Sequence, residues 1–470
     1  TRDRKRMDMT MTTVPAGYEP SPWWSGAAPH PRPPLVGDVR VDYVVVGAGL
    51  AGLAAAYFLR RNRPDATVVV LEANRVGSGA TGASTGIVAP GVGGPITVLR
   101  RRYGDRVAAA TFAGSVTAVA RTVELVEREH LDCDLELNGQ LVCAVSARQD
   151  RALRAQHRSF AELGFDIPYL PARELAERFG GRPYRSALRH PLAATLDPVR
   201  LSRSLAGLLT GLGVTIHERS PVLSVRPGVP VQLRCPSGIV RAKHVVMATD
   251  GVQPEGLGSA GVVPITGHVI RTDPLTDRQL DRIGWLDRDS VVDCRTFFNY
   301  YRLTPDHRII MGGGRVTLPP GIRGGVGSAT AWNRIEHELR TIFPDLASVP
   351  VSDRWSGRIG SVLDRMPRLG RLPAAPGVWF TGGWCGHGIP LSVQAGYEIA
   401  RRITGVAGQD DVAWYREKVL ALPGGPPRDW GLQAYLAGLD RRDRMLHRFG
   451  AVGREFVRPP VSDRLSGAHR

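Results

Sequence analysis

Three glycines and one glutamate near the start of the chain have the types and spacing of a nucleotide site. Gly47, Gly49 and Gly52 follow a G-x-G-x-x-G pattern, and Glu72 comes 20 positions after Gly52 (72 − 52). The first glycine allows a tight turn, the second lets backbone approach a pyrophosphate, and the third lets a helix pack closely on a strand. A carboxylate at Glu72 can accept hydrogen bonds from both ribose hydroxyls and would repel a 2′-phosphate. The pattern predicts a dinucleotide site for FAD or NAD; the alternative is a ligand-free glycine turn.

The elements that position these residues are predicted to be a strand, a turn, a helix and a second strand. Val44–Val46 is an apolar, β-branched run that suits a strand buried on both faces. Residues 50–61 are rich in Ala and Leu, which favours a helix that begins with Leu50 and Ala51, and residues 68–71 form the second strand. The N-terminus of that helix offers unpaired N–H groups and a partial positive charge to phosphate oxygens.

Two further small-residue segments are candidate ligand contacts. Residues 73–91 contain Gly, Ser or Thr at most positions without a helical period, so we expect a loop that contacts a flat ring or a phosphate; the alternative is a surface loop. A second glycine-rich turn, residues 382–388, follows a strand over 378–381 and precedes a helix over 391–403. The strand Val245–Ala248 ends in small polar residues, and open α/β sheets place ligands at such ends.

Composition bounds the class of protein. A chain of 470 residues can form two domains. The net charge of +17 comes almost entirely from arginine, because the only lysines are Lys5, Lys243 and Lys418, and no dense basic tract appears. We therefore predict no nucleic-acid partner, although an acidic substrate is possible. Five scattered cysteines and no apolar leader indicate neither a disulfide framework nor a metal site, and we expect a cytoplasmic protein for which membrane contact is not expected.

The two ends of the chain differ from the rest. Residues 1–35 are polar and then rich in Pro and Trp, which predicts an arm without regular structure whose Trp23 and Trp24 pack on the body or on a neighbouring subunit. Residues 430–449 form a basic amphipathic pattern, which predicts either a helix docked on the domain or a helix for a membrane surface or partner.

Several motifs in a fixed order carry a resemblance to a known family. They read VVVGAGLAGL, LEANRVGSGATGAS, VVMATDG, YYRLTPDHRIIMGGG, RMPRLG and TGGWCGHGIPLS. Over roughly residues 35–405 the chain resembles the FAD-dependent D-amino-acid-oxidase-like superfamily, in particular the branch with gamma-glutamylputrescine oxidase and the glycine and sarcosine oxidases. The resemblance implies an α/β fold. In it, a Rossmann-like FAD-binding domain of residues 36–98, 190–255 and 346–410 carries an inserted β-rich (α+β) substrate domain of residues 99–189 and 256–345. The arm 1–35 and a helical extension 411–470 flank them.

The resemblance also implies which residues contact FAD. The pyrophosphate would contact Gly47, Gly49, Leu50, Ala51 and Gly52; the ribose would contact Glu72, with Ala73 and Arg75 beside it; and the flavin would lie along Ala80, Thr81, Gly82, Ala83 and Ser84. The adenine would contact Val222, the ribityl path Ala248, Thr249 and Asp250, and the pyrimidine edge Gly383, Cys385, Gly386, His387, Gly388 and Ile389. Amide donors at that edge would stabilise the negative charge of reduced flavin.

Four residues are candidates for the chemistry. Arg358 lies one position from where glycine oxidase has its carboxylate-binding arginine, and the alternative is that it supports the flavin loop. Tyr300 and Arg302 alternate onto one face of a strand in the β-rich segment, and the alternative is ordinary sheet packing. His387 could act as a general base, or its neighbouring glycines could be the functional part. Cys385 replaces a serine of the family and is expected to fill its space.

These observations favour a flavoenzyme that oxidises a C–N bond of an amine or amino acid. The family chemistry implies hydride transfer to flavin N5, hydrolysis of the imine and reoxidation of the flavin by O2 to H2O2. FAD is expected to be non-covalent, because Arg358 and Ile359 stand where sarcosine oxidases carry their flavin-linking cysteine. One alternative is a dehydrogenase that uses a quinone or electron-transfer protein, because no lysine occupies the strand where sarcosine oxidases activate oxygen. Another is a non-catalytic FAD-bearing subunit; the sequence leaves the oligomeric state open.

Overall fold

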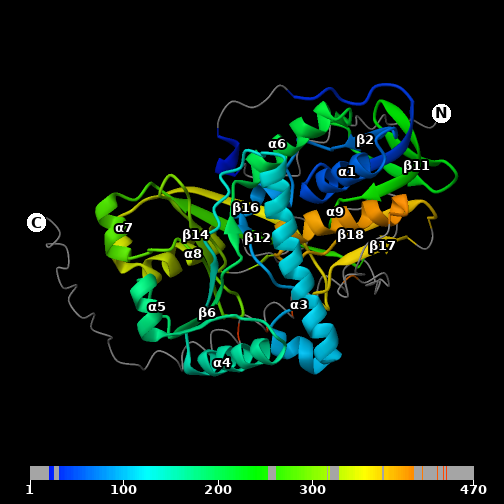
Figure 1. Ribbon diagram of the computed structural model, residues 1–470. Coiled ribbons are helices and arrows are strands. Elements are labelled where there is room, and N and C mark those ends of the chain that lie inside the picture. Colours follow the sequence, from blue (N-terminus) through cyan, green and yellow to red (C-terminus); the bar gives the residue numbers. More distant parts are fainter. Residues whose placement is uncertain are drawn as a thin grey trace, which may run out of the picture.

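The computed structural model describes residues 21–25, 31–251, 261–314, 316–317, 328–372 and 375–406, together with Tyr415 and the isolated positions 431, 434, 438 and 441. The predicted helix over 430–449 and most of the extension 411–470 fall outside these residues. Within the described part, two eight-stranded sheets form the framework, and Figure 1 shows them side by side.

The first sheet carries the predicted nucleotide unit. Its strand order is β17-β18-β11-β1-β2-β8, with β9 and β10 added beside β11. The bounds are β1 (Val39–Val46), β2 (Val68–Leu71), β8 (Thr215–His217), β9 (Ser224–Arg226), β10 (Val231–Cys235), β11 (Gly238–Met247), β17 (Arg368–Arg371) and β18 (Val378–Gly382). The strands β18, β11, β1, β2 and β8 run parallel. Val44 and Val45 are fully buried, which confirms a strand covered on both faces.

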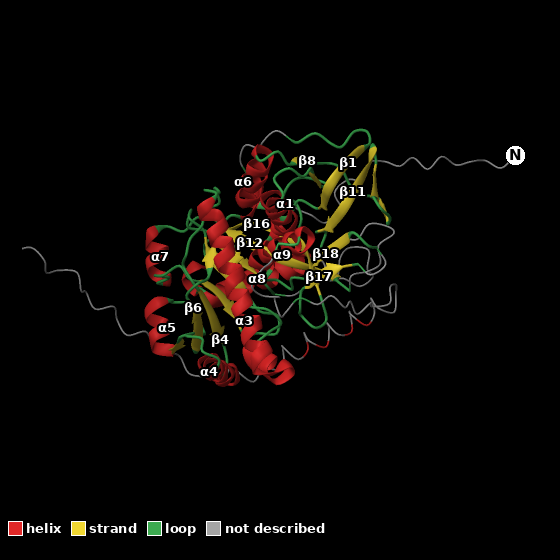
Figure 2. Ribbon diagram, turned by 45° about the vertical axis from the view of Figure 1, so that its right-hand side comes forward, coloured by secondary structure: helices red, strands yellow, loops and turns green. Residues whose placement is uncertain are grey.

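Four helices accompany this sheet: α1 (Leu50–Asn62), α3 (Ile96–Arg128, interrupted at Gly104), α6 (Pro198–Gly211) and α9 (Gly388–Thr404). The contact between α1 and α9 is so close that a Cβ atom on Gly396 would lie 2.5 Å from the amide nitrogen of Ala55. Figure 2 shows the long helix α3 to the left of α1 and α9, and α3 packs on α9. Because β1 and β18 run parallel, the helices that follow them begin at the same edge of the sheet.

The second sheet has the order β16-β12-β15-β14-β13-β4-β6-β5. Its bounds are β4 (Gln140–Ala144), β5 (Tyr169–Pro171), β6 (Ser186–His190), β12 (Val263–Thr272), β13 (Ser290–Asp293), β14 (Tyr300–Leu303), β15 (Ile309–Gly312) and β16 (Val351–Ser361). An apolar cluster joins one face to α5 (Ala172–Arg178), α7 (Asp277–Ile283) and α8 (Ser328–Ile342). The predicted hairpin at Pro305–Asp306 is confirmed as β14–β15. The remaining elements are the helix α4 (Ala147–Glu162), the strand pair β3 (Ile87–Val88) and β7 (Ala194–Thr195), the short helix α2 (Ala80–Ala83), and the 3-10 turns η1 (Pro22–Trp24) and η2 (Pro344–Leu346).

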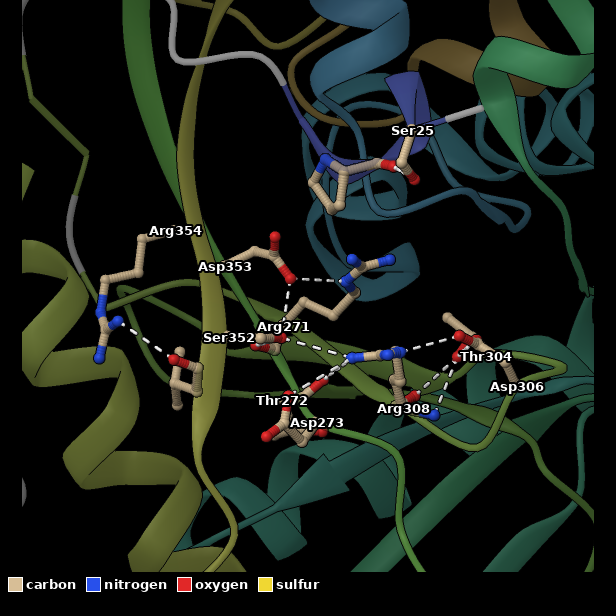
Figure 3. Close-up of polar contacts among 12 residues, drawn as sticks. Ser25, Arg271, Thr272, Asp273, Thr304, Asp306, Arg308, Ser352, Asp353 and Arg354 are labelled. Atoms are coloured by element: carbon tan, nitrogen blue, oxygen red, sulfur yellow. Dashed lines mark hydrogen bonds and ion pairs between the residues drawn. The ribbon is translucent and has the colours of Figure 1, made fainter. Parts of the chain in front are cut away.

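A polar network fixes one end of this sheet (Figure 3). Arg271 on β12 pairs with Asp353 on β16 at 2.9 Å, and Arg308 in the hairpin pairs with Asp306 at 2.8 Å. Arg308 also donates to the carbonyl of Thr272 at 3.1 Å. The edge pair β12–β16 and the hairpin are therefore held as one unit.

The strand pairing differs from one predicted domain boundary. We assigned residues 346–410 to the nucleotide domain, whereas β16 pairs along its length with β12 in the second sheet. The third segment of the nucleotide domain therefore begins after Ser361. The strand β16 is not recognisable in the sequence 355–370, because glycine, serine and arginine take positions at which a strand usually has apolar residues.

Candidate cofactor and active site

The glycine turn between β1 and α1 depends on backbone contacts that no larger residue permits. Gly47 has a φ of +101°, and a Cβ atom there would lie 2.7 Å from the carbonyl oxygen of Ala248. A Cβ atom on Gly52 would lie 1.9 Å from the carbonyl oxygen of Gly47. A Cβ atom on Gly49, in contrast, would meet only the hydroxyl of Thr81, at 3.2 Å. Gly47 and Gly52 thus shape the turn, whereas Gly49 keeps the space beside it open.

The N-terminus of α1 presents free donors. Its cap residue, Gly49, has no side chain, and the amide of Leu50 donates to the hydroxyl of Thr81 at 3.2 Å. The amides of Gly49, Ala51 and Gly52 donate to no acceptor among the described residues. Such orphan amides at a helix N-terminus form an anion site.

Glu72 lies at the end of β2 beside this turn and is 9% exposed. Its carboxylate accepts hydrogen bonds from the amides of Ala48 at 2.7 Å and Asn74 at 2.8 Å. Burial raises the pKa of Glu72, and the two amides oppose that rise. The carboxylate is therefore fixed next to the orphan amides, where a ribose joined to a pyrophosphate would need it.

Asp250 connects the end of β16 to the second glycine turn. Its carboxylate accepts from the amide of Gly360 at 2.6 Å and from the amide of Gly383 at 2.7 Å. Burial raises the pKa of this carboxyl, and its own backbone has a φ of +51°. We predicted Asp250 as a cofactor contact; the structure shows it holding two segments that converge beside β11.

The second turn contains Cys385 and His387. The Cys385 thiol accepts from the amide of Val362 at 3.4 Å, which is the bond a serine oxygen would make, and burial raises the pKa of the thiol. His387 is exposed and lies against Gly91, where a Cβ atom would be 3.0 Å from its Nε2. Desolvation and the charge of Arg365 lower the pKa of His387, so the ring is neutral near pH 7.

One face of the second sheet is turned toward the α2 loop. The indole of Trp355 donates to the carbonyl of Ala83 at 2.9 Å, and a Cβ atom on Gly357 would lie 2.4 Å from the Cβ of Ala83. In the strand register Trp355 is opposite Val269, Val269 is opposite Gly312, and Gly312 is opposite Tyr300. These four residues therefore lie on the same face of the sheet. We call it the loop-facing face.

Tyr300 lies on the loop-facing face with its ring against a glycine. A Cβ atom on Gly312 would be 2.3 Å from the ring, so only glycine leaves room for this tyrosine. The Tyr300 hydroxyl makes no hydrogen bond to any residue that the structure describes. Burial raises its pKa to about 12, so the phenol keeps its proton and can act as a donor.

Arg302 shares this face, as the alternation predicts, but its guanidinium is engaged. It donates to the carbonyls of Thr85 at 2.7 Å and Leu196 at 2.8 Å, and it is 1% exposed. Burial lowers its pKa to about 10, so it remains charged near neutral pH. Arg302 thus joins the second sheet to the segments before β3 and after β7, and its guanidinium is not a free fork for a substrate.

Arg358 lies on the opposite face. Ser356, two positions before it on β16, bonds at 2.8 Å to His268, and that ring packs edge-on against Trp332 of α8. Arg358 is half-buried and makes no hydrogen bond or ion pair with a described residue. The structure therefore does not bring Arg358 together with Tyr300.

The remaining predicted residues fall into two groups. The predicted contacts Leu50, Ala51 and Gly52, at the start of α1 beside the turn, are buried. Ala73 and Arg75 are exposed, and Val222 is half-buried at the edge of an apolar cluster. Sequence reasoning missed the importance of Ser21, Trp23 and Trp355, which contact the α2 loop. The signal available was a tryptophan pair in an otherwise polar arm. The described residues contain no cluster of metal ligands, and the described helices include none long and apolar enough to cross a membrane.

The described geometry fits a dinucleotide such as FAD. Orphan amides at α1, a fixed carboxylate at Glu72 and the open space kept by Gly49 all lie at the carboxyl ends of β1 and β2. The second sheet closes over the α2 loop and presents Tyr300 on that side. The fold and the site are those of an α/β dinucleotide-binding protein.

Comparison with known proteins identifies the family. The model of the FAD-dependent oxidoreductase family matches residues 42–402, and the chain belongs to this family. It is 30% identical over 382 residues to gamma-glutamylputrescine oxidoreductase of Escherichia coli, covering 80% of this chain and 86% of that protein. The fold is similar to that of glycine oxidase from Geobacillus kaustophilus (TM-score 0.68, 21% identity, covering 80% of this chain and 97% of that one). It is also similar to L-proline dehydrogenase from P. horikoshii (TM-score 0.65, 18% identity, covering 81% and 97%).

Proposed function

We propose that this protein is an FAD-dependent enzyme that oxidises a C–N bond of an amine or amino acid. The observation that carries the proposal is the loop-facing face of the second sheet, which presents the unpaired Tyr300 phenol toward the loop that follows the nucleotide turn. Membership of the FAD-dependent oxidoreductase family and the likeness to an oxidoreductase of gamma-glutamylputrescine support the substrate class.

The roles of this chain's residues follow from their positions. The amides of Gly49, Ala51 and Gly52 would bind the pyrophosphate, and Glu72 would accept from the ribose. In the 383–388 turn the amides of Gly383, Cys385 and His387 already donate within the protein. The amides of Gly386 and Gly388, at the start of α9, would therefore be the ones that stabilise negative charge on the flavin pyrimidine. When bound, FAD supplies a ring that accepts a hydride from the carbon next to the substrate nitrogen.

The remaining site groups orient the substrate rather than ionise it. The Tyr300 phenol is a proton-bearing donor at neutral pH, and the neutral His387 ring can accept a hydrogen bond from an ammonium group. An amine must lose its proton before its lone pair can assist hydride departure. The apolar, glycine-lined surroundings of Tyr300 favour that neutral form by desolvation.

The electron acceptor separates two candidate activities. Oxygen as acceptor would make the protein an oxidase that releases H2O2, and this is the activity we propose first. A dehydrogenase that uses a quinone or an electron-transfer protein is the second candidate. Among the described residues Lys243 is the only lysine, and it is 74% exposed and paired with Asp42 at 2.7 Å. A lysine that activates oxygen is therefore not contributed by the described part of the chain.

One experiment tests the proposal and the acceptor together. Protein loaded with FAD is mixed without oxygen with a panel of amines and amino acids, including gamma-glutamylated amines, and loss of the visible flavin absorbance is followed. Bleaching by an amine supports the proposal. Readmission of oxygen, or addition of a soluble quinone, then shows which acceptor restores the colour. Protein that binds FAD but is bleached by no amine, while chemical reductants bleach it, would overturn the proposal.

A further inference from the structure

Four consecutive carbonyls of the α2 loop are each held by a side chain from a distant part of the chain. The hydrogen bonds run to Gly82 from Ser21, to Ala83 from Trp355, to Ser84 from Trp23 and to Thr85 from Arg302. The Trp23 and Trp355 bonds are 2.9 Å long, and the Arg302 bond is 2.7 Å. All four donors are buried, at 9% exposure or less. We call Ser21, Trp23, Trp355 and Arg302 the carbonyl clamp.

Half of the carbonyl clamp comes from the N-terminal arm. Ser21 directly precedes the short turn η1, and Trp23 is the middle residue of that turn. The ring of Trp23 lies 5.3 Å from the guanidinium carbon of Arg302. The arm segment thus fills the gap between the second sheet and α6, where Trp23 packs with Val199 and Trp355. The prediction that the tryptophans pack on the body is confirmed.

The arm is also tied to the other end of the same loop. Glu218 accepts from the amide of Arg32 at 3.0 Å and from the amide of Val76 at 2.8 Å. The amide of Leu35 donates to Ser220 at 2.8 Å. Glu218 thus links Arg32 of the arm to Val76 in the segment between β2 and β3, whereas Ser21 and Trp23 bond directly to the later part of that segment.

These contacts supply hydrogen-bond donors to carbonyl groups that lack partners in the local backbone. The turn α2 has only four residues, so its last carbonyls lack partners within the helix, and the extended residues that follow pair with no strand. Without the clamp, buried carbonyls would lose their hydrogen bonds. With it, the loop has one conformation before any ligand arrives, which removes the cost of ordering it on binding.

We propose that Ser21 and Trp23 are positioning residues for the cofactor: the arm pre-forms the loop that lines the flavin, and so carries part of the affinity for FAD. The inference rests on the proposed function, because it takes the ligand of this loop to be FAD. It also assigns Arg302 and Trp355 to loop positioning rather than to substrate contact.

The arm offers two matched pairs of variants for the test. Ser21→Ala removes a hydroxyl that bonds to the loop, whereas Ser25→Ala removes one that bonds only to Pro22 within the arm (Figure 3). Trp23→Phe keeps an aromatic ring but removes the N–H that holds Ser84. Trp24→Phe removes an N–H that makes no hydrogen bond to a described residue, and its ring lies against Arg203.

Three readouts are taken on full-length protein. The dissociation constant of FAD is measured on apoprotein, the melting temperature is measured on the same apoprotein, and amide exchange of the segment 80–86 is followed by mass spectrometry. We expect Ser21→Ala and Trp23→Phe each to weaken FAD binding about two- to tenfold, the effect of one neutral hydrogen bond. Exchange over 80–86 should become faster and the visible circular dichroism of bound flavin should change, while Ser25→Ala and Trp24→Phe match the parent protein.

The outcomes separate the inference from the proposed function. If the parent protein binds no FAD, the proposed function fails. If the parent binds FAD and both members of each pair bind it equally, with equal exchange over 80–86, the positioning role is overturned. A fall in melting temperature that is the same within each pair, without a difference in FAD affinity, would also overturn it, because the arm would then act only on stability.

Discussion

The glycine turn and the α2 loop are neighbours in the structure but are built in different ways. The turn around Gly47 and Gly52 is shaped by backbone atoms: a Cβ atom on Gly52 would meet the carbonyl of Gly47, and a Cβ atom on Gly47 would meet the carbonyl of Ala248 at the end of β11. The loop is held by side chains 61 to 272 positions away. A turn that requires glycines can be recognised as a motif in the sequence. A loop held by distant side chains is represented in the sequence only by scattered hydrogen-bond donors.

The largest expected effect is on the turn itself. Gly52→Ala places a Cβ atom 1.9 Å from the Gly47 carbonyl, a contact that relaxation of a side chain cannot relieve. We expect a loss of about 3 kcal/mol or more in unfolding free energy, together with loss of FAD binding. Gly207→Ala on α6 is the matched control, because nothing lies within 4 Å of its Cβ position. Thermal unfolding and flavin content measure both; Gly52→Ala with parent stability would contradict the close-contact argument.

Gly49→Val separates the shape of the turn from the space beside it. The Cβ position on Gly49 meets only the Thr81 hydroxyl, at 3.2 Å, so the apoprotein should fold. The added branch would occupy the space of the pyrophosphate, and we expect FAD affinity to fall about 30-fold or more, which corresponds to about 2 kcal/mol. Titration of apoprotein with FAD measures this. Full affinity in a folded Gly49→Val protein would show that the phosphate lies elsewhere.

The pH dependence of stability compares buried ionisable groups in the two sheets. Burial lowers the pKa of His268, in the second sheet, from 6.5 to about 4, whereas burial raises the pKa of Glu72 in the first. Above pH 6.5 His268 is neutral in both folded and unfolded protein. As pH falls from 6.5 towards 4 only the unfolded state binds the proton, so up to about 3 kcal/mol of stability is lost from this group. Glu72 acts with the opposite sign, because its folded state favours the protonated form.

Urea unfolding of the apoprotein at pH 7.5 and pH 5 measures that slope. His268→Asn should lower stability at pH 7.5, because the contacts to Ser356 and Thr317 are changed, and should flatten the dependence on pH. His190, whose pKa burial also lowers to about 4, should retain its share of the slope. An unchanged slope in His268→Asn would show that this ring titrates normally.

Tyr300 and Tyr301 allow the two faces of the second sheet to be compared at adjacent positions. Tyr300 has an unpaired hydroxyl on the loop-facing face, whereas Tyr301 is buried on the other face and its hydroxyl lies 2.8 Å from that of Tyr184. We expect Tyr300→Phe to lower kcat/KM about three- to tenfold at unchanged stability, and Tyr301→Phe to lower stability by about 1 kcal/mol at unchanged kcat/KM. Steady-state kinetics on FAD-loaded protein and thermal unfolding measure the pair. The reverse pattern would exchange the roles of the faces.

The same contrast explains what the sequence could predict. The β1–α1–β2 unit, the hairpin at Pro305 and the order of the elements follow from apolar periods and turn residues, and Glu72 follows from its distance to the glycines. The strand β16 was not predicted, because glycine and polar residues mask the alternation of apolar and polar residues that marks a strand. The predicted domain boundary within 346–410 differs from the strand pairing for the same reason. Arg302 was correctly placed on a face, but whether its guanidinium is free depends on carbonyls 106 and 217 positions away. No local pattern reports such contacts.

Substitution of Arg358 should give the smallest effect on kcat/KM. It tests whether the loop-facing face, as assigned from Trp355, extends along β16 as far as Arg358. If Arg358 paired with a substrate carboxylate, Arg358→Ala would cost about 2–5 kcal/mol on acidic substrates only. The structure instead places Arg358 on the face of Ser356 and His268, away from Tyr300, without a partner among the described residues. We therefore expect Arg358→Ala to change kcat/KM by less than about threefold, equally for an amino acid and for its amide, because Arg358 lies on the face opposite Tyr300 and has no partner among the described residues. Flavin content should equal that of the parent protein. A loss confined to the amino acid would mean that the end of β16 turns its even positions toward the cofactor, and that the loop-facing face ends before Arg358.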